Sequence, residues 1–297
     1  MDIIDLLQTN TAAFTAAVFA LSLLIGSFLN VVIYRLPLIL DAQWRAQCAE
    51  LSGQPAAEDG QALTLSSPRS HCPACKATVK AIHNIPVVSW LALRGRCANC
   101  GAAIPVRYPL VELATAILSA VVAWHFGFSF EAGCALLVTW MLIPLTGIDA
   151  DHQLLPDSIT LPLLWLGLLA SLRHDPASTG ALPVAPADAI IGAAAGYLFL
   201  WSVFHAFKLL TGKEGMGFGD FKLFAALGAW LGWQMLPLIL LLSAAVGALV
   251  GIALIVFRKQ GREVPIPYGP YLAGAGWIAM LWGPQIVSGY LSVAGLR

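Results

Sequence analysis

Two clusters of acidic residues adjoin long apolar runs, and their residue types suit acid–base chemistry. Residues 148–157 read Ile-Asp-Ala-Asp-His-Gln-Leu-Leu-Pro-Asp, and residues 215–222 read Gly-Met-Gly-Phe-Gly-Asp-Phe-Lys. Two carboxyl groups brought close together do not both ionise easily, so one keeps its proton and the pair titrates as a unit. A neutral acid beside an anionic base suits aspartyl proteolysis, because the base takes a proton from water while the acid polarises the scissile carbonyl. Asp149 and Asp220 are the candidates for such a pair.

The residues around these candidates also have structural interpretations. Asp220 precedes an apolar run, so it could be the N-cap of a helix in a flexible interhelical loop. We favour an N-cap role for Asp157, which follows a proline and precedes another apolar run. Gly217 and Gly219 remove side chains before Asp220, which lets a substrate backbone approach closely.

Lys222 follows Asp220 by two residues. It could balance charge or position the loop near Asp220. The alternative, which we favour from the sequence, is an anchor on the basic side of a membrane.

Four cysteines form a second constellation. Cys72-Pro-Ala-Cys75 and Cys97-Ala-Asn-Cys100 are two Cys-x-x-Cys turns separated by 21 residues. This spacing places four thiolates at the corners of a tetrahedron, as in a structural zinc ribbon, and leaves no open position for catalysis. A pair of disulfides and a dithiol redox site are the alternatives. A reducing compartment disfavours the first, and the two matched turns disfavour the second.

The composition excludes a water-soluble globular chain. Hydrophobic residues make up 59% of the 297 residues and charged residues 11%, against about 25% charged in soluble domains. The net charge is zero, so nothing indicates a nucleic-acid partner. A transmembrane helix needs about 20 mostly apolar residues. The candidate spans are 11–33, 109–127, 130–148, 158–172, 187–211, about 219–232, 236–257 and 268–290, with a turn expected at 232–237.

The basic residues predict the orientation of these spans. If the eight segments cross a bilayer alternately, one side receives fourteen of the sixteen basic residues, and the other receives only Arg173 and Arg297. Cytoplasmic loops carry an excess of Lys and Arg. The basic side is therefore expected to be cytoplasmic, with both termini outside and both acidic clusters at the cytoplasmic face. The fourteen residues are Arg35, Arg45, Arg69, Lys76, Lys80, Arg94, Arg96, Arg107, Lys208, Lys213, Lys222, Arg258, Lys259 and Arg262.

The expected architecture is an all-α polytopic membrane protein with about eight transmembrane helices. A small cytoplasmic zinc-ribbon-like domain is inserted between the first and second spans. The expected divisions are 1–34 for the first transmembrane helix, 35–107 for the zinc-binding domain and 108–297 for the remaining bundle. A metal would stabilise the inserted domain, which has few large apolar residues.

Together, these motifs resemble a known family. Gly217-Phe-Gly-Asp220 matches the Gly-x-Gly-Asp signature of intramembrane aspartyl proteases. Combined with 149–157, Gly-Ser-Phe-Leu-Asn-Val-Val-Ile-Tyr-Arg-Leu-Pro (26–37), the double Cys-x-x-Cys and Pro-Tyr-Gly-Pro (267–270), the chain resembles the bacterial type IV prepilin peptidases over about residues 20–290.

The resemblance implies a bifunctional enzyme of the bacterial inner membrane. It would cleave the basic leader of type IV prepilins or type II secretion pseudopilins after a glycine at the cytoplasmic face. It would then N-methylate the new terminal residue with S-adenosylmethionine. By position, the catalytic aspartates fall on Asp149 and Asp220, and the zinc ligands on Cys72, Cys75, Cys97 and Cys100.

The methyl-transfer site has weaker sequence signals. The chain shows no Gly-x-Gly-x-x-Gly between a soluble strand and a helix. By the resemblance, the cysteine-rich domain is the natural location. Within it, Arg94-Gly95-Arg96 could contact a carboxylate or adenosine, although an ordinary basic surface is slightly favoured. Glu112 could pair with Arg107 or take part in methylation.

Two other classes of function also fit parts of the sequence. Intramembrane carboxylates and glycine-interrupted helices suit a proton- or cation-coupled transporter. The position of both aspartates at a membrane face and the absence of an inverted repeat disfavour it. A zinc-sensing membrane scaffold without catalysis is the second alternative. Both alternatives predict that replacing Asp149 leaves peptide processing unchanged.

Overall fold

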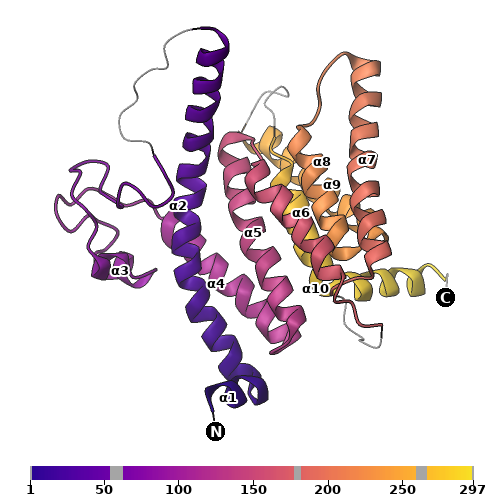
Figure 1. Cartoon of the computed structure of the whole chain (residues 1–297), viewed down its shortest axis with the longest axis horizontal. Helices are drawn as coiled ribbons and strands as arrows, with labels where there is room; N and C mark the ends of the chain where they lie inside the picture. Colours follow the sequence, from indigo (N-terminus) through magenta and orange to yellow (C-terminus); the bar gives the residue numbers. More distant parts are fainter. Residues whose placement is uncertain (1, 54–62, 177–181, 259–265, 296–297) are drawn as a thin grey trace. The chain divides into compact units, whose positions relative to one another are not determined.

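The computed structural model describes residues 2–53, 63–176, 182–258 and 266–295 (Figure 1). Within these ranges the chain is helical, and the only extended pairings are two isolated bridges, His71 with Thr78 and Arg96 with Ala103. The all-α expectation is therefore confirmed for the described residues. Lys259, Arg262 and Arg297, which entered the charge count, lie outside them.

The chain divides into two compact units, Met1–Phe128 and Ser129–Arg297. The helix α4 falls in the first unit, although the sequence grouped residues 108–127 with the later spans. The expected divisions at residues 34 and 107 separate membrane from cytoplasmic segments and stay predictions.

The first unit is built on two long helices. Its elements are α1 (Ile3–Thr9), α2 (Thr11–Leu51), the 3-10 turn η1 (Ala81–Asn84), α3 (Val88–Ala92) and α4 (Arg107–Phe126). α2 packs along α4, and Gly26 makes this possible because a Cβ there would lie 2.7 Å from Cα of Glu112. α2 does not end near residue 33, where the expected span ends, but continues to Leu51.

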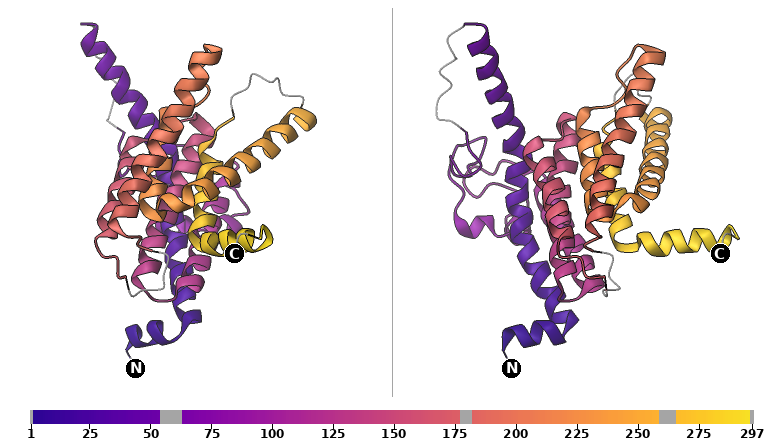
Figure 2. Two further views of the ribbon diagram at one scale, coloured as in Figure 1. Left: turned by 90° about the vertical axis from the view of Figure 1, so that its right-hand side faces the viewer. Right: turned by 45° about the vertical axis from the view of Figure 1, so that its right-hand side comes forward.

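The described residues of the second unit form a bundle of six helices. They are α5 (Phe130–His152), α6 (Asp157–Ser171), α7 (Pro186–Thr211), α8 (Phe218–Leu231), α9 (Leu236–Arg258) and α10 (Gly269–Val293), with the 3-10 turn η2 (Trp233–Met235) before α9. α10 contains Pro284, and the helix bends along its length (Figure 2). A proline inside a helix is a common cause of such a bend.

α8 is the central helix of this bundle. Every residue from Asp220 to Leu231 except Lys222 is buried, and α6, α7, α9 and α10 all contact it. A helix that is apolar all round belongs in an interior. Its ends are set by glycines, since Gly217 is the N-cap and Gly232 follows its last residue at φ +77°.

Helices occupy all eight segments expected to span the membrane. Five of the described helical segments are long and apolar enough to cross a bilayer: Thr11–Leu51, Arg107–Phe126, Phe130–His152, Pro186–Thr211 and Trp233–Leu254. α6 has 15 residues and α8 has 14. The structure thus confirms a helical protein with several membrane-length segments, while the count of eight spans stays a prediction.

The helices α7 and α8 approach each other closely at two glycines. A Cβ on Gly228 would overlap the carbonyl group of Gly192, and a Cβ on Gly192 would overlap that of Gly228. Small residues at such crossings let membrane helices approach closely and gain van der Waals contact.

We expect Gly228→Ala to destabilise the protein by about 1–3 kcal/mol, because the added methyl group forces α7 and α8 apart. Thermal unfolding in detergent measures the effect. Gly133→Ala in α5 is the control, since no heavy atom lies within 4 Å of a Cβ at that position. An unfolding temperature of Gly228→Ala equal to that of Gly133→Ala would contradict the proposed packing.

Candidate active site

The two candidate aspartates come from the ends of two different helices. Asp149 lies in the last turn of α5, and Asp220 lies in the first turn of α8. Both are buried, with exposed fractions of 5% and 7%, and their carboxyl groups interact electrostatically. The structure thus brings together the pair that the sequence singled out. The N-cap interpretation of Asp220 is wrong, because Gly217 caps α8.

Asp149 is held by the start of a third helix. The backbone N–H of Gly269, the first residue of α10, donates a hydrogen bond of 2.9 Å to Oδ2 of Asp149. The first N–H groups of a helix have no partner inside the helix and are good donors to an anion. A Cβ on Gly269 would lie 2.7 Å from Oδ2, so only glycine allows this approach. The Pro-Tyr-Gly-Pro motif (267–270) thus contributes the backbone N–H that holds Asp149.

Leu155 packs into the space that two glycines leave. A Cβ on Gly219 would lie 2.7 Å from Cβ of Leu155, and one on Gly269 would lie 3.2 Å from its Cδ2. Gly219 therefore makes room for the protein's own side chain. Gly217 is different, since the nearest atom to a Cβ there is Oδ2 of Asp220 at 3.8 Å. Close approach of a substrate backbone stays a prediction, and Gly217 has the more open position of the two.

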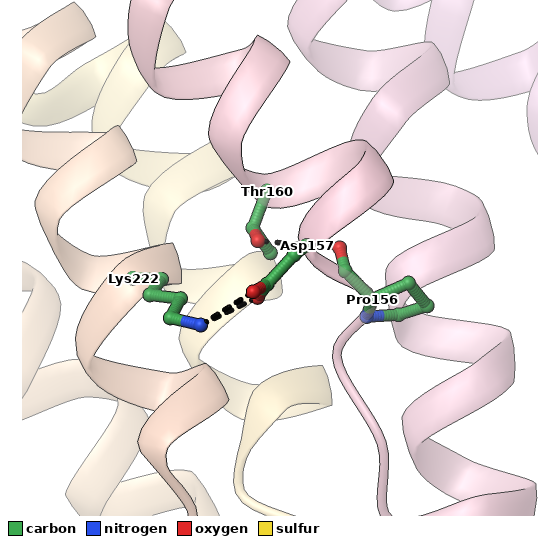
Figure 3. A network of polar contacts seen from close by, with 4 residues as sticks. All are labelled: Pro156, Asp157, Thr160 and Lys222. Carbon is green, nitrogen blue, oxygen red and sulfur yellow. Dashed lines mark hydrogen bonds and ion pairs between the residues drawn. The ribbon is translucent and has the colours of Figure 1, made fainter. Parts of the chain in front are cut away.

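Lys222 has a specific partner. Its Nζ donates to both carboxylate oxygens of Asp157, at 2.6 and 2.7 Å, and so joins α8 to α6 (Figure 3). The N-cap interpretation of Asp157 is wrong, because Pro156 is the N-cap and Asp157 is the first helical residue. No local pattern indicates that these two residues, 65 positions apart, would pair.

The segment 266–271 forms another edge of the site. Tyr268 OH lies 2.7 Å from the buried hydroxyl of Ser243 in α9, and Tyr268 interacts electrostatically with Asp220. The same tyrosine lines an apolar cavity of about 180 Å³ between α9 and the start of α10, together with Ala244, Gly247 and Tyr271.

The four expected metal ligands lie together in the first unit. The Sγ atoms of Cys72, Cys75, Cys97 and Cys100 are all within 4.8 Å of one another. Those of Cys72 and Cys100 are 3.8 Å apart. Four Zn–S bonds of about 2.3 Å in a tetrahedron place the sulfurs about 3.8 Å apart. The cluster therefore fits a closed four-thiolate metal site.

The two Cys-x-x-Cys turns share one backbone design. In the first turn, Cys72 N–H donates to the carbonyl of Ala77, and Lys76 N–H donates to the carbonyl of Cys72. In the second turn, Cys97 N–H donates to the carbonyl of Ala102, and Gly101 N–H donates to the carbonyl of Cys97. An isolated bridge closes each turn.

The first turn also receives a side-chain donor. The amide of Asn99 donates to Sγ of Cys75 at 3.5 Å. This hydrogen bond makes the largest contribution, followed by that from the backbone of Ala77, to lowering the pKa of Cys75 to about 6. The thiolate form of that cysteine, which is the form that binds metal, is thereby favoured.

The candidate methyl-transfer residues take two different kinds of position. Arg94 and Arg96 are exposed, whereas Gly95 is buried at φ +68° against the ring of Trp90. The indole of Trp90 donates to the carbonyl of Ile104 at 3.1 Å. Gly95 thus lets the chain pass close to Trp90 just before the second Cys-x-x-Cys turn. Its two neighbours in the sequence, Arg94 and Arg96, are exposed.

Glu112 ties α4 to the cysteine-rich segment. Its buried carboxylate accepts a 2.7 Å hydrogen bond from the backbone N–H of Val87 and another from Ser27. Pairing with Arg107, one of the two alternatives for Glu112, stays a prediction. Val87 has φ +60° and ψ −51°, and Val88 N–H donates to Pro86 across it at 2.5 Å. This γ-turn is strained for a β-branched residue.

Comparison with known proteins places both units in one family. The bacterial peptidase A24 N-terminal domain matches residues 20–126, and the type IV leader peptidase family matches residues 136–252. The chain belongs to this family. No solved structure gives a significant match.

Curated relatives align with the chain over nearly its whole length. A protein of Stutzerimonas stutzeri is 54% identical over 99% of both chains, and one of Pseudomonas aeruginosa is 53% identical over 100% of both. One of Aeromonas salmonicida is 57% identical over 93% of both. All three are named prepilin leader peptidase/N-methyltransferase.

We expect Glu112→Ala to loosen the cysteine-rich segment, because it removes the acceptor that holds the strained turn at Val87. Limited proteolysis with mass-spectrometric mapping should show faster cleavage within residues 63–106. Glu50→Ala is the control, since Glu50 is an exposed residue of α2. Equal cleavage rates for the two variants would show that Glu112 does not restrain the segment.

Proposed function

We propose that this chain cleaves the leader of type IV prepilins or pseudopilins and N-methylates the new terminus. The observation that carries the peptidase half is the pair of interacting buried carboxyl groups, Asp149 and Asp220, with Asp149 held by Gly269. In the part of the chain that the structure describes, no basic side chain pairs with either carboxyl. Such a pair holds one proton between its members.

The proposed cleavage uses that proton directly. The anionic carboxylate takes a proton from water as the water oxygen attacks the carbonyl of the glycine that precedes the cut, and the neutral acid protonates the carbonyl oxygen. The tetrahedral intermediate then collapses, the C–N bond breaks, and the leaving nitrogen receives a proton from the pair. No covalent link to the enzyme forms. Gly217 offers the open position through which the substrate backbone reaches the site.

The surroundings of the pair suit a substrate that is part polar leader and part membrane helix. The cavity beside Tyr268 is apolar, so it offers space for an apolar side chain close to the cut.

We place the site at the cytoplasmic face of the bacterial inner membrane, with both termini periplasmic, because the basic residues gather on that side.

Methyl transfer is assigned to the first unit. S-adenosylmethionine would supply the methyl group to the new terminal amine: its S–CH3 bond would break, S-adenosylhomocysteine would leave, and the amine would lose a proton. Arg94 and Arg96 are exposed on either side of Gly95, and guanidinium groups are suited to a carboxylate ligand. Glu112 is proposed to hold the adjoining turn in place.

The cysteine cluster is assigned a structural zinc ion. Cys72, Cys75, Cys97 and Cys100 would fill all four positions of a tetrahedral ion and leave none for water. The ion would then hold the two Cys-x-x-Cys turns together without taking part in either reaction.

We expect Asp149→Asn and Asp220→Asn each to lower prepilin cleavage by at least about 100-fold, because an amide neither accepts the proton nor donates it as the acid does. The size shift of full-length prepilin in detergent measures cleavage. Transfer of labelled methyl to pre-cleaved pilin is the internal control and should be unchanged. Cleavage at the wild-type rate by either variant would show that its aspartate is structural and would reopen the transporter and scaffold alternatives.

Metal analysis of the purified protein is expected to give about one zinc ion per chain, because four thiolates complete one tetrahedral site. Cys97→Ser should lose the zinc, whereas Cys134→Ser should keep it, since Cys134 lies in α5 in the second unit. Limited proteolysis within residues 63–106 should become faster when the zinc is lost. Folded protein that contains no metal and resists proteolysis would contradict this assignment.

A further inference from the structure

Residues 149–157, from the last turn of α5 to the first residue of α6, hold the start of α8 at two points. Leu155 packs against Gly219, and Asp157 pairs with Lys222. These two contacts lie on either side of Asp220 in the sequence of α8. The stretch includes Asp149 itself, whose carbonyl accepts the N–H of Gln153 at 2.9 Å where α5 ends. One short stretch of chain thus carries one carboxyl and fixes the helix that carries the other.

The position of Lys222 is not explained by its own helix. Cations are favoured near the C-terminus of a helix, whereas Lys222 lies near the N-terminus of α8. Asp157 is the first residue of α6, where the helix dipole favours a carboxylate. The dipole of α6 therefore favours the charge of Asp157, the dipole of α8 does not favour that of Lys222, and the role of Lys222 lies in its contact with α6.

The ion pair is poorly placed to contribute much to global stability. The side chain of Lys222 is 28% exposed and that of Asp157 is 56% exposed, and solvent-exposed pairs contribute little to folding. Its geometry is nevertheless well defined, since Nζ contacts both oxygens (Figure 3). On the other side of Asp157, Thr160 Oγ1 donates to Pro156 O at 3.2 Å, which fixes the start of α6. A well-defined link with little effect on stability suits a positional role.

We propose that the Asp157–Lys222 ion pair is a positioning element for leader cleavage. It sets the rotation of the first turn of α8 and thereby directs the Asp220 carboxyl toward Asp149. This inference rests on the proposed function, in which these two carboxyls do the chemistry. Lys222 and Asp157 touch neither the substrate nor the reacting atoms.

The test uses full-length protein in detergent and four variants. They are Lys222→Met, Asp157→Asn, the double variant that combines them, and the exchange variant Asp157→Lys with Lys222→Asp. We expect each single variant to lower kcat for cleavage about 10- to 100-fold, since a small misplacement of a catalytic group has effects of this size. KM for prepilin and methylation of pre-cleaved pilin should not change. The first double variant should be no worse than the single variants, and the exchange should recover much of kcat.

Two further readouts separate position from charge and from folding. If Lys222 acted through its charge on the carboxyl pair, Lys222→Met would shift the pH optimum of kcat, whereas a positional role lowers kcat throughout the profile. Thermal unfolding should remain close to wild type. Lys208→Met and Glu214→Gln are the matched controls, because that pair is also 2.7 Å long but joins the end of α7 to the loop before α8. The control variants should cleave at the wild-type rate.

The outcomes distinguish this inference from the proposed function. Wild-type kcat in both Lys222→Met and Asp157→Asn, while Asp149→Asn is inactive, would overturn the inference and leave the proposed function standing. Additive losses in the first double variant, or parallel losses of cleavage, methylation and thermal stability, would also overturn it. Active Asp149→Asn and Asp220→Asn variants would instead overturn the proposed function.

Discussion

Burial of two carboxyl groups that interact electrostatically is the constraint around which the second unit is organised. Asp149 and Asp220 are both almost fully buried, and each needs a polar contact that an apolar bundle seldom offers. The bundle meets this need by bringing helix ends together. The end of α5 and the starts of α8 and α10 converge, so that the N–H of Gly269 reaches Asp149. The positions of these three helices therefore depend on one another.

Glycines make this convergence possible. Gly269 gives the Asp149 carboxyl access to the backbone, Gly219 admits Leu155, and Gly192 with Gly228 allows α7 to support α8. Each position has a neighbour within overlap distance of a Cβ. Apart from any substrate, these four glycines are thus required by the fold, whereas Gly217 has an open position. The freedom of glycine matters less here than its small size.

The sequence was more informative about the chemistry of the site than about the contacts between residues far apart in the chain. Asp149 and Asp220 could be assigned to one membrane face because apolar runs and basic residues are local patterns, and the four cysteines because their spacing is regular. The helical segments could also be predicted, because runs of apolar residues are a local pattern. The bond between Gly269 and Asp149 joins residues 120 positions apart, and the pair of Lys222 and Asp157 joins residues 65 apart. No local pattern encodes such contacts. α2 was expected to end near residue 33, because hydropathy marks where a membrane ends and not where a helix ends.

The lengths of α6 and α8 bear on how water reaches a buried peptide bond. With 15 and 14 residues, these helices are about 23 and 21 Å long, whereas the hydrocarbon layer of a bilayer is about 30 Å thick. On the proposed topology, α6 would face lipid with its exposed Leu161, Trp165 and Leu169, and a lipid-facing helix shorter than the hydrocarbon layer thins the bilayer beside it. The carboxyl pair at the start of α8 would then lie beside a thinned part of the membrane, at a depth to which water and headgroups descend. The short helices would thus let hydrolysis take place beside a membrane-embedded substrate, and would make its rate depend on the acyl chain length of the surrounding lipid.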